Sequence, residues 1–185
     1  MNIHAIHHEA KSKYAYAFDA NTLHIRLRTA KNDVTGVTMI WGDPFNWRRL
    51  TEEERVSHAT QAADGDFTQT HTWAHAPEAP MPMKKDYSDQ YFDYWFIEVK
   101  PEYKRTRYAF VIEDNGAKHA STKLFFGAHG AIDMAKHPEI FKSLSDYFNF
   151  PYINKEDVFE APAWVKDTVW YQIFPERFAN GDASL

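Results

Sequence analysis

The segment Thr168-Val-Trp-Tyr-Gln-Ile-Phe-Pro-Glu-Arg-Phe-Ala-Asn-Gly-Asp182 changes character at Pro175, from an apolar half to a polar half. Its leading half is a continuous run of β-branched and aromatic residues. Such a run is typical of a strand that is covered on both faces, as in a parallel barrel. The second half is rich in turn residues. The sequence therefore predicts a buried strand over 168–174, succeeded by a loop.

Residues Trp170 to Asp182 resemble, without a gap, the first strand and adjoining loop of the catalytic barrel in the neopullulanase, cyclomaltodextrinase and maltogenic amylase group of the α-amylase family. The preceding segment Glu160-Ala-Pro-Ala-Trp-Val-Lys-Asp-Thr-Val169 resembles the approach to that barrel. Further similarity lies in the N-terminal half, at Glu9 to Tyr16, Thr22 to Thr29, Gly42 to Trp47 and Phe92 to Pro101. The resemblance covers most of the chain, but residues from about 48 to 78 and from 127 to 146 depart from it and inherit no function.

The catalytic machinery of the resembled family is not expected in this chain. A (β/α)₈ barrel takes about 250 residues, and only its first strand is expected here. Retaining glycosidases use two carboxylates about 5 Å apart, and the resemblance implies that the nucleophile and the acid lie on later strands. We therefore assign no catalytic residue, leave Glu176 and Asp182 without a catalytic role, and expect the chain itself to be inactive.

The composition fits a globular protein and excludes several partners. Of the 185 residues, 44% are hydrophobic and 16% aromatic, which is enough for a real core. The net charge of −5 is spread without a basic stripe, so nucleic acid is not an expected partner. The chain has no cysteine, and no apolar run approaches the roughly 18 residues that cross a membrane. A start without a basic segment and an apolar one after it predicts a cytoplasmic protein.

Two short extended segments, at 5–8 and 14–18, are predicted near the N-terminus. Two clearer strands follow them, with a bend after the second. The run from Leu23 to Thr29 alternates apolar and polar residues, which is typical of a half-buried antiparallel strand. The run from Val34 to Trp41 is the second strand. It ends at Gly42-Asp43-Pro44, whose residues favour a tight bend and prevent continued pairing.

Three further strands are predicted in the middle of the chain, at 92–100, 107–113 and 123–126. The connection from Pro101 to Thr106 is short, so we expect the first two to pair with each other as a hairpin. Between the bend and these strands, Thr51-Glu-Glu-Glu54 carries a capping-box pattern that predicts a helix over 52–61.

These elements predict a mainly β fold: an immunoglobulin-like β-sandwich, then a linker, then the first strand of an incomplete (β/α)₈ barrel. Periodicity indicates the strands, whereas the resemblance implies the immunoglobulin-like topology. We place the sandwich at 1–126, the linker at 127–167 and the start of the barrel at 168–185. Pro138 and the apolar spacing after it predict a short helix over about 138–147 within the linker.

Phe45 and Trp47 are the candidate substrate-binding residues. In the resembled enzymes the N-terminal domain reaches across a homodimer and adds an aromatic loop to the partner's substrate cleft, and both residues fall in that loop. An exposed aromatic ring can stack on the C–H face of a sugar. Related sequences usually have Tyr in place of Phe45, so the hydroxyl of that contact is missing here. The alternative, that both rings close the end of the core, is left equally open.

Asn180 and Asp182 are the candidate metal ligands. They resemble the loop in which many members of the group hold calcium, an ion that takes six to eight oxygen ligands. Two side chains are too few, so we expect calcium in the full-length enzyme and none in this chain. The pair His71 and His75 lies in a region that reads as extended or loop, and it predicts no metal site.

The sequence is interpreted as the N-terminal glucan-binding and dimerisation part of a glycoside hydrolase. The resemblance implies that the enzyme cleaves α-1,4 glucosidic bonds, with α-1,6 bonds as a second candidate, in cyclodextrins, pullulan or maltooligosaccharides. Its expected partners are α-glucan oligosaccharides and a second copy of the chain. The alternatives are a stand-alone carbohydrate-binding or dimerisation sandwich without catalytic activity, and an adhesion-like sandwich that binds no sugar.

Overall fold

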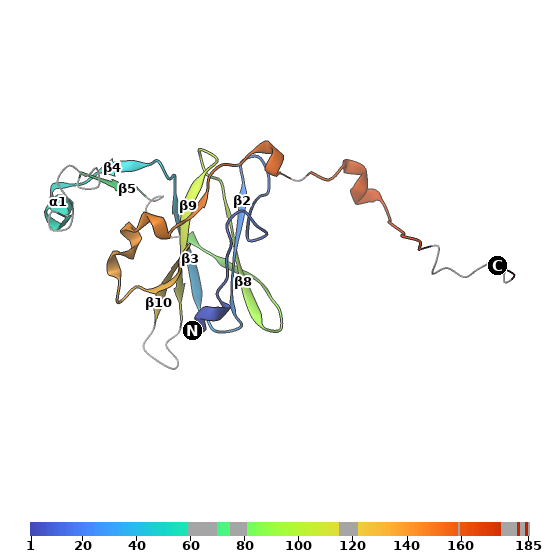
Figure 1. Cartoon of the computed structure of the whole chain (residues 1–185), viewed down its shortest axis with the longest axis horizontal. Helices are drawn as coiled ribbons and strands as arrows, with labels where there is room; N and C mark the ends of the chain where they lie inside the picture. Colours follow the sequence, from blue (N-terminus) through green and yellow to red (C-terminus); the bar gives the residue numbers. More distant parts are fainter. Residues whose placement is uncertain are drawn as a thin grey trace.

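A computed structural model describes residues 1–58, 70–74, 81–114, 122–158, 160–174, 181 and 184. Two antiparallel sheets pack face to face, and a two-stranded arm projects from them (Figure 1). The four-stranded sheet has the order β1-β2-β8-β7, and the six-stranded sheet has the order β11-β10-β9-β3-β6 with β12 also paired to β9. This architecture confirms the predicted mainly β sandwich.

The strands are β1 (Ala15–Ala17), β2 (Leu23–Ala30), β3 (Gly36–Gly42), β4 (Trp47–Arg49), β5 (His71–Trp73), β6 (Met81–Pro82), β7 (Lys84–Ser88), β8 (Phe92–Val99), β9 (Thr106–Glu113), β10 (Lys123–Gly127), β11 (Gly130–Asp133) and β12 (Phe148–Phe150). The helices are the α-helix α1 (Glu52–His58) and the 3₁₀ helices η1 (Ile3–Ala5), η3 (Pro138–Lys142), η4 (Leu144–Asp146), η5 (Lys155–Asp157) and η6 (Ala163–Asp167). Among the described residues, none of these helices has the length and apolar character needed to cross a membrane.

The predicted alternation of β2 is confirmed and fixes its orientation. Leu23, Ile25 and Leu27 are fully buried, and the residues between them are half-buried on the outer face. Each lies opposite a residue of β8 in an unbroken antiparallel register. Burial of this apolar face against the other sheet holds the two layers together.

His8 links the two sheets through hydrogen bonds. Its Nδ1 lies 2.7 Å from the carbonyl oxygen of Arg26, and its Nε2 lies 2.9 Å from the hydroxyl of Tyr108. A carbonyl can only accept, so Nδ1 carries the proton and Nε2 accepts from the tyrosine. Burial lowers the pKa of His8 from 6.5 to about 4, so the ring is neutral in the folded protein at pH 7.

The predicted hairpin between the strands at 92–100 and 107–113 is wrong. Strand β8 pairs with β2 and β7, whereas β9 pairs with β3, β10 and β12, so the two consecutive strands lie in different sheets. The short connection crosses the end of the sandwich, with Lys104 at a φ of 56° closing a turn onto Pro101. Their burial patterns differ accordingly: β8 alternates, but β9 is buried almost throughout because a second apolar cluster covers its far face.

The six-stranded sheet continues beyond residue 126, the predicted end of the sandwich. β11 pairs with β10, and β12 pairs with β9 in the register Phe148 to Tyr108. Phe150 and Ile153 are buried in the main core, and the Ile153 amide donates to the carbonyl of Lys104 at 2.7 Å. Part of the predicted linker therefore belongs to the sandwich.

The predicted helix over 138–147 forms as two shorter 3₁₀ helices. Pro138 stands in the first turn of η3, as expected, but Ser143 at ψ 87° separates η3 from η4. Ile140 and the later Tyr147 nevertheless pack with Phe125 in the second cluster. The apolar spacing therefore identifies the buried face correctly, while the predicted helix type is wrong.

The capping box at the start of α1 is confirmed. The Glu54 amide donates to the Thr51 hydroxyl at 3.3 Å, and the Thr51 amide donates to the Glu54 carboxylate at 2.8 Å. Arg48 binds the same carboxylate through both of its terminal nitrogens, at 2.8 and 2.7 Å. These bonds tie α1 to β4, so the helix and the β4–β5 arm form one projection (Figure 1).

The predicted buried strand over 168–174 does not form. The run lies in no strand of the described chain, and Val169 is 95% exposed. Trp170 contacts Trp164 of η6, with ring centroids 5.6 Å apart, but is itself 68% exposed. A parallel barrel strand is stabilised by neighbouring strands on both sides, and none of the described strands pairs with this run. It extends away from the sandwich (Figure 1).

Candidate functional site

The bend after β3 is built around Asp43. Its carboxylate accepts from the Phe45 amide at 2.9 Å, and its carbonyl accepts from the Asn46 amide at 3.0 Å and from the Trp73 indole N–H at 2.7 Å. These bonds satisfy the turn locally and attach it to β5. The predicted tight bend at Gly42-Asp43-Pro44 is therefore confirmed, and it places Phe45 at its tip.

Arg105 holds the bend from the other side. Its Nε and Nη2 donate to the two carboxylate oxygens of Asp43 at 2.9 and 3.0 Å, a paired geometry that fixes the plane of the guanidinium. These hydrogen bonds hold the pKa of Asp43 below its usual value. The guanidinium carbon lies 4.6 Å from the centre of the Phe45 ring and 5.3 Å from that of Tyr103. One cation thus orders a carboxylate and two aromatic rings.

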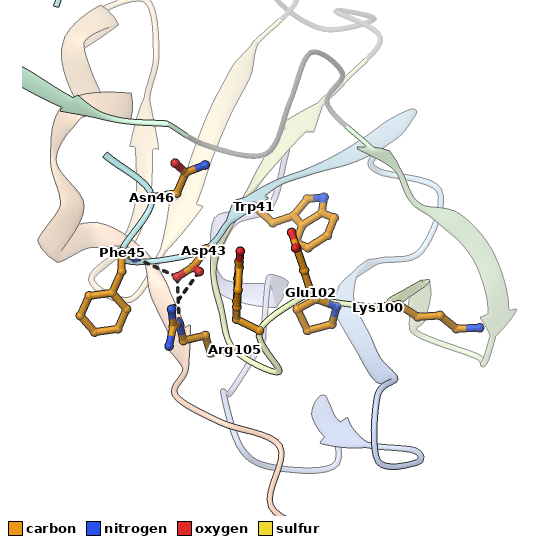
Figure 2. A pocket seen from close by; sticks show the side chains of 9 residues that line it. Trp41, Asp43, Phe45, Asn46, Lys100, Glu102 and Arg105 are labelled. Atoms are coloured by element: carbon orange, nitrogen blue, oxygen red, sulfur yellow. Dashed lines mark hydrogen bonds and ion pairs between the residues drawn. The ribbon is translucent and has the colours of Figure 1, made fainter. Parts of the chain in front are cut away.

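These residues line an open pocket of about 720 Å³ at the end of the sandwich (Figure 2). Its walls come from the bend after β3 and from the connection between β8 and β9. The lining residues are Trp41, Asp43, Phe45, Asn46, Lys100, Pro101, Glu102, Tyr103 and Arg105. The volume falls in the range of sites for small organic ligands. The pocket combines aromatic faces with charged and amide groups, which is the combination that a sugar ring requires.

The structure separates the two predicted aromatic residues. Phe45 is 72% exposed and lines the pocket. Trp47 is half-buried, lies opposite Trp73 in the β4–β5 pair and packs against the second apolar cluster. Trp47 is not among the residues that line this pocket, and its role in binding substrate stays a prediction.

The sequence does not single out Arg105, Tyr103 or Asp43 as site residues. Asp43 is predictable only as a bend residue, and its partner Arg105 lies 62 positions further along the chain. The contact follows from the antiparallel pairing of β3 with β9, in which Gly42 lies opposite Arg107, and no local pattern in the sequence predicts that pairing. One feature of the sequence could have pointed to this part of the site: the short connection between β8 and β9 contains an aromatic residue, Tyr103, and a basic residue, Arg105.

The structure does not place the predicted calcium ligands, because Asn180 and Asp182 lie outside the described residues. The described part of the chain holds no group of three His, Asp or Glu side chains arranged for a metal ion. His71 lies in β5, while His75 is outside the described residues.

Comparison with known proteins identifies relatives along the whole chain. Residues 1–154 match the family described as alpha amylase, N-terminal ig-like domain. The chain is 42% identical over 185 residues to a cyclomaltodextrinase of Geobacillus thermopakistaniensis (strain MAS1), covering all of this chain and 26% of the relative. It is 42% identical over 178 residues to a maltogenic alpha-amylase of Bacillus acidopullulyticus, covering 96% of this chain and 25% of the relative.

A solved structure of a cyclomaltodextrinase agrees with these matches. It superposes with a TM-score of 0.64 at 32% identity, covering 99% of this chain and 25% of that one. The chain thus spans about a quarter of the length of the relatives that it matches.

Proposed function

Because the chain belongs to the family of alpha-amylase N-terminal ig-like domains, we propose that it is the glucan-binding and dimerisation part of a glycoside hydrolase. The proposed enzyme cleaves α-1,4 glucosidic bonds, with α-1,6 bonds as a second candidate, in cyclodextrins, pullulan or maltooligosaccharides. Support comes from the names of the relatives, which include cyclomaltodextrinase, maltogenic alpha-amylase and neopullulanase. Since this chain spans about a quarter of their length, the activity belongs to a longer protein in this proposal.

The exposed ring of Phe45 is the observation that carries the proposal. Phe45 is 72% exposed, yet the Asp43 carboxylate holds its amide and the Arg105 guanidinium stacks on its ring. The ring is exposed to solvent but already ordered, so it loses little side-chain entropy when a ligand binds to its face. The C–H face of a glucose unit is the ligand surface that such a ring fits.

We also propose that the ring works in a homodimer, where it extends the substrate cleft of the partner. The ring lies at the tip of the bend and is 72% exposed, so a partner can reach it. In this proposal the two carboxylates that cleave the bond lie outside the residues of this chain, so the chain alone does not turn over β-cyclodextrin or pullulan. Turnover that rises in proportion to the purified chain would contradict this.

The binding test is a titration of the chain with maltotriose, monitored by tryptophan fluorescence, because Trp41 lines the pocket. We expect Phe45→Ala to weaken binding by about fivefold to tenfold, the loss that corresponds to one stacked ring. Phe18→Ala is the matched control, since Phe18 is also an exposed phenylalanine, 57% exposed, and is not part of the pocket. If Phe45→Ala and Phe18→Ala bind maltotriose with equal affinity, the Phe45 ring is not part of the binding site.

The second candidate function is a stand-alone carbohydrate-binding or dimerisation sandwich. Binding of maltotriose in the titration above would support this function as well. The two functions are distinguished by whether the gene also encodes a catalytic barrel next to this segment. We propose a cytoplasmic location for either protein, a proposal supported by a relative from Bacillus subtilis (strain 168) named intracellular maltogenic amylase, 37% identical over 185 residues. Cell fractionation with an antibody against the sandwich tests this location.

A further inference from the structure

A second pocket lies on the outer face of the four-stranded sheet. It has a volume of about 560 Å³ and is lined by Lys13, Tyr14, Arg26, Asp86, Tyr87 and Tyr94. It shares no lining residue with the pocket at Phe45. The alternation of β2 explains the polar part of its lining: Ile25 and Leu27 are buried in the core, while Arg26 between them lies on the outer face.

A β-bulge in β7 builds the aromatic wall of this pocket. Lys85 lies opposite Trp95, but the next pair in the register is Tyr87 with Tyr94, so Asp86 is the extra residue. In a regular strand Tyr87 would share the inner face with Lys85. The bulge turns it to the outer face instead, beside Tyr94. The two rings then lie 5.6 Å apart with an interplanar angle of 37°.

One wall of the pocket is rigid and the other is open to solvent. The hydroxyl of Tyr94 donates to the carboxylate of Asp89 at 2.9 Å, which holds this ring in place. Tyr14 is buried, with its ring edge against His7 at a centroid distance of 4.7 Å. Tyr87 is 61% exposed and offers a face to solvent. A flat ligand can therefore stack on Tyr87 without displacing the core.

The polar groups of the pocket keep unused hydrogen-bonding capacity. The closest approach of Arg26 to Asp86 is 3.9 Å, from Nη2 to Oδ2, and within the described residues neither side chain makes a hydrogen bond. A guanidinium and a carboxylate at this spacing can donate to and accept from neighbouring hydroxyls of one ligand. Lys13 and Arg26 bring positive charge to the lining and Asp86 brings negative charge, which disfavours a purely apolar ligand. Together with the open face of Tyr87, these groups match a polyol with an apolar face.

From this geometry we propose that the outer face of the four-stranded sheet is a second carbohydrate site, in which a glucose unit of an α-glucan stacks on Tyr87 and bonds to Arg26 and Asp86. The choice of an α-glucan, though not the site itself, rests on the proposed function. A second site would hold a long glucan on the sandwich while the Phe45 pocket engages another part of it, which raises the local concentration of the polymer.

Maltotriose titrations of the 185-residue chain, monitored by isothermal calorimetry and by ligand-observed NMR, test the site. In the Phe45→Ala background we expect residual binding, which Tyr87→Ala weakens further by about fivefold to tenfold. Asp86→Asn should weaken it as well, because the amide disturbs the pairing with Arg26. The control is Tyr91→Ala, since Tyr91 is 67% exposed and lies outside the pocket, and it should leave the affinity unchanged.

The outcomes separate this site from the one at Phe45. Loss of affinity in Tyr87→Ala with no effect of Phe45→Ala supports the second site and rejects the first. If Tyr87→Ala behaves like Tyr91→Ala, or if maltotriose binds none of the variants, the second site is overturned. Light scattering without sugar gives a further check: a change of oligomeric state in Tyr87→Ala at unchanged affinity would make this face a protein interface instead.

Discussion

The guanidinium of Arg105 lies 4.6 Å from the centre of the Phe45 ring and at the same time binds both carboxylate oxygens of Asp43. Arg105 therefore acts as a positioning residue for the exposed ring. We expect Arg105→Gln to weaken maltotriose binding by about twofold to fivefold, the loss that corresponds to an exposed cation–π contact. Arg105→Lys should bind nearly as weakly, because an ammonium cannot bind Asp43 in the paired geometry.

A double variant checks that the effect passes through the ring. If Arg105 acts only by positioning Phe45, Phe45→Ala with Arg105→Gln should bind maltotriose as weakly as Phe45→Ala alone. Additive losses in the double variant would show that Arg105 contacts the sugar itself.

Acid should destabilise the fold through His8. Its pKa is about 4 in the folded protein and 6.5 in the unfolded chain, so below pH 6.5 the unfolded state binds more protons. The stability that depends on the neutral ring is complete above pH 6.5 and is lost as the pH falls toward 4. Between pH 7 and pH 5 we expect a loss of about 2 kcal/mol, measured by urea unfolding. His8→Gln should flatten this dependence, whereas His4→Gln, at an exposed position, should retain it.

Gly127 should not tolerate a side chain. A Cβ at this position would lie 1.8 Å from the carbonyl oxygen of Asp146, which is backbone and cannot move aside easily. We expect Gly127→Ala to lower the free energy of unfolding by about 1–3 kcal/mol, the range for overpacking. Gly36→Ala is the control, because nothing lies within 4 Å of its Cβ position, and its thermal midpoint should be equal to or above that of the parent. Equal losses in the two variants would contradict the close approach at Gly127.

The capping box should control local opening of α1. Removing the hydroxyl in Thr51→Ala leaves the Glu54 amide without its acceptor, so amide exchange there should accelerate about fivefold. Thr51→Ser keeps the hydroxyl and should exchange like the parent. The hydrogen bonds from Arg48 and from the Thr51 amide lower the pKa of Glu54 to about 2, so the exchange difference should persist at pH 4. A difference that disappears at pH 4 would show that the carboxylate is not held as described.

The exposed apolar run at 168–174 should make the chain self-associate. Val169, Trp170 and Tyr171 are 95%, 68% and 78% exposed, and such a patch favours edge pairing or aggregation. Light scattering should give a larger particle for the full chain than for one that ends at Glu160, after the buried Ile153. A full chain that is monomeric, with slow amide exchange from Trp170 to Phe174, would mean that the run is covered within its own chain.

Local patterns predict the elements whose stability is local. The alternation of Leu23, Ile25 and Leu27 identifies β2 and its buried face, and the Thr51 and Glu54 pair identifies the start of α1, because each depends on neighbours in sequence. The pairing of β8 and β9 is not predictable in this way, because a short connection can form a hairpin or cross between sheets, and the choice depends on distant strands. The prediction of a strand at 168–174 is wrong for a similar reason, because such a strand would be stabilised by other strands beside it.

The pocket at Phe45 is half predictable. The bend and the exposed ring depend on Gly42-Asp43-Pro44 and its surroundings, but Arg105 reaches Asp43 only once β3 has paired with β9, a strand far along the chain. The second pocket depends on a bulge at Asp86, and no local pattern distinguishes this bulge from a regular strand.

The strand order has a consequence for synthesis on the ribosome. β2 pairs with β8 and β3 pairs with β9, so the two early strands do not both have their partners until residue 113 has been made. β9 in turn acquires β12 only at residue 150. Pairings of such separation close slowly, and a nascent chain that stops before them exposes two apolar faces. We expect the first stretch of about 100 residues to depend on chaperones as it emerges, and the whole sandwich to condense in one step when Ile153 leaves the exit tunnel.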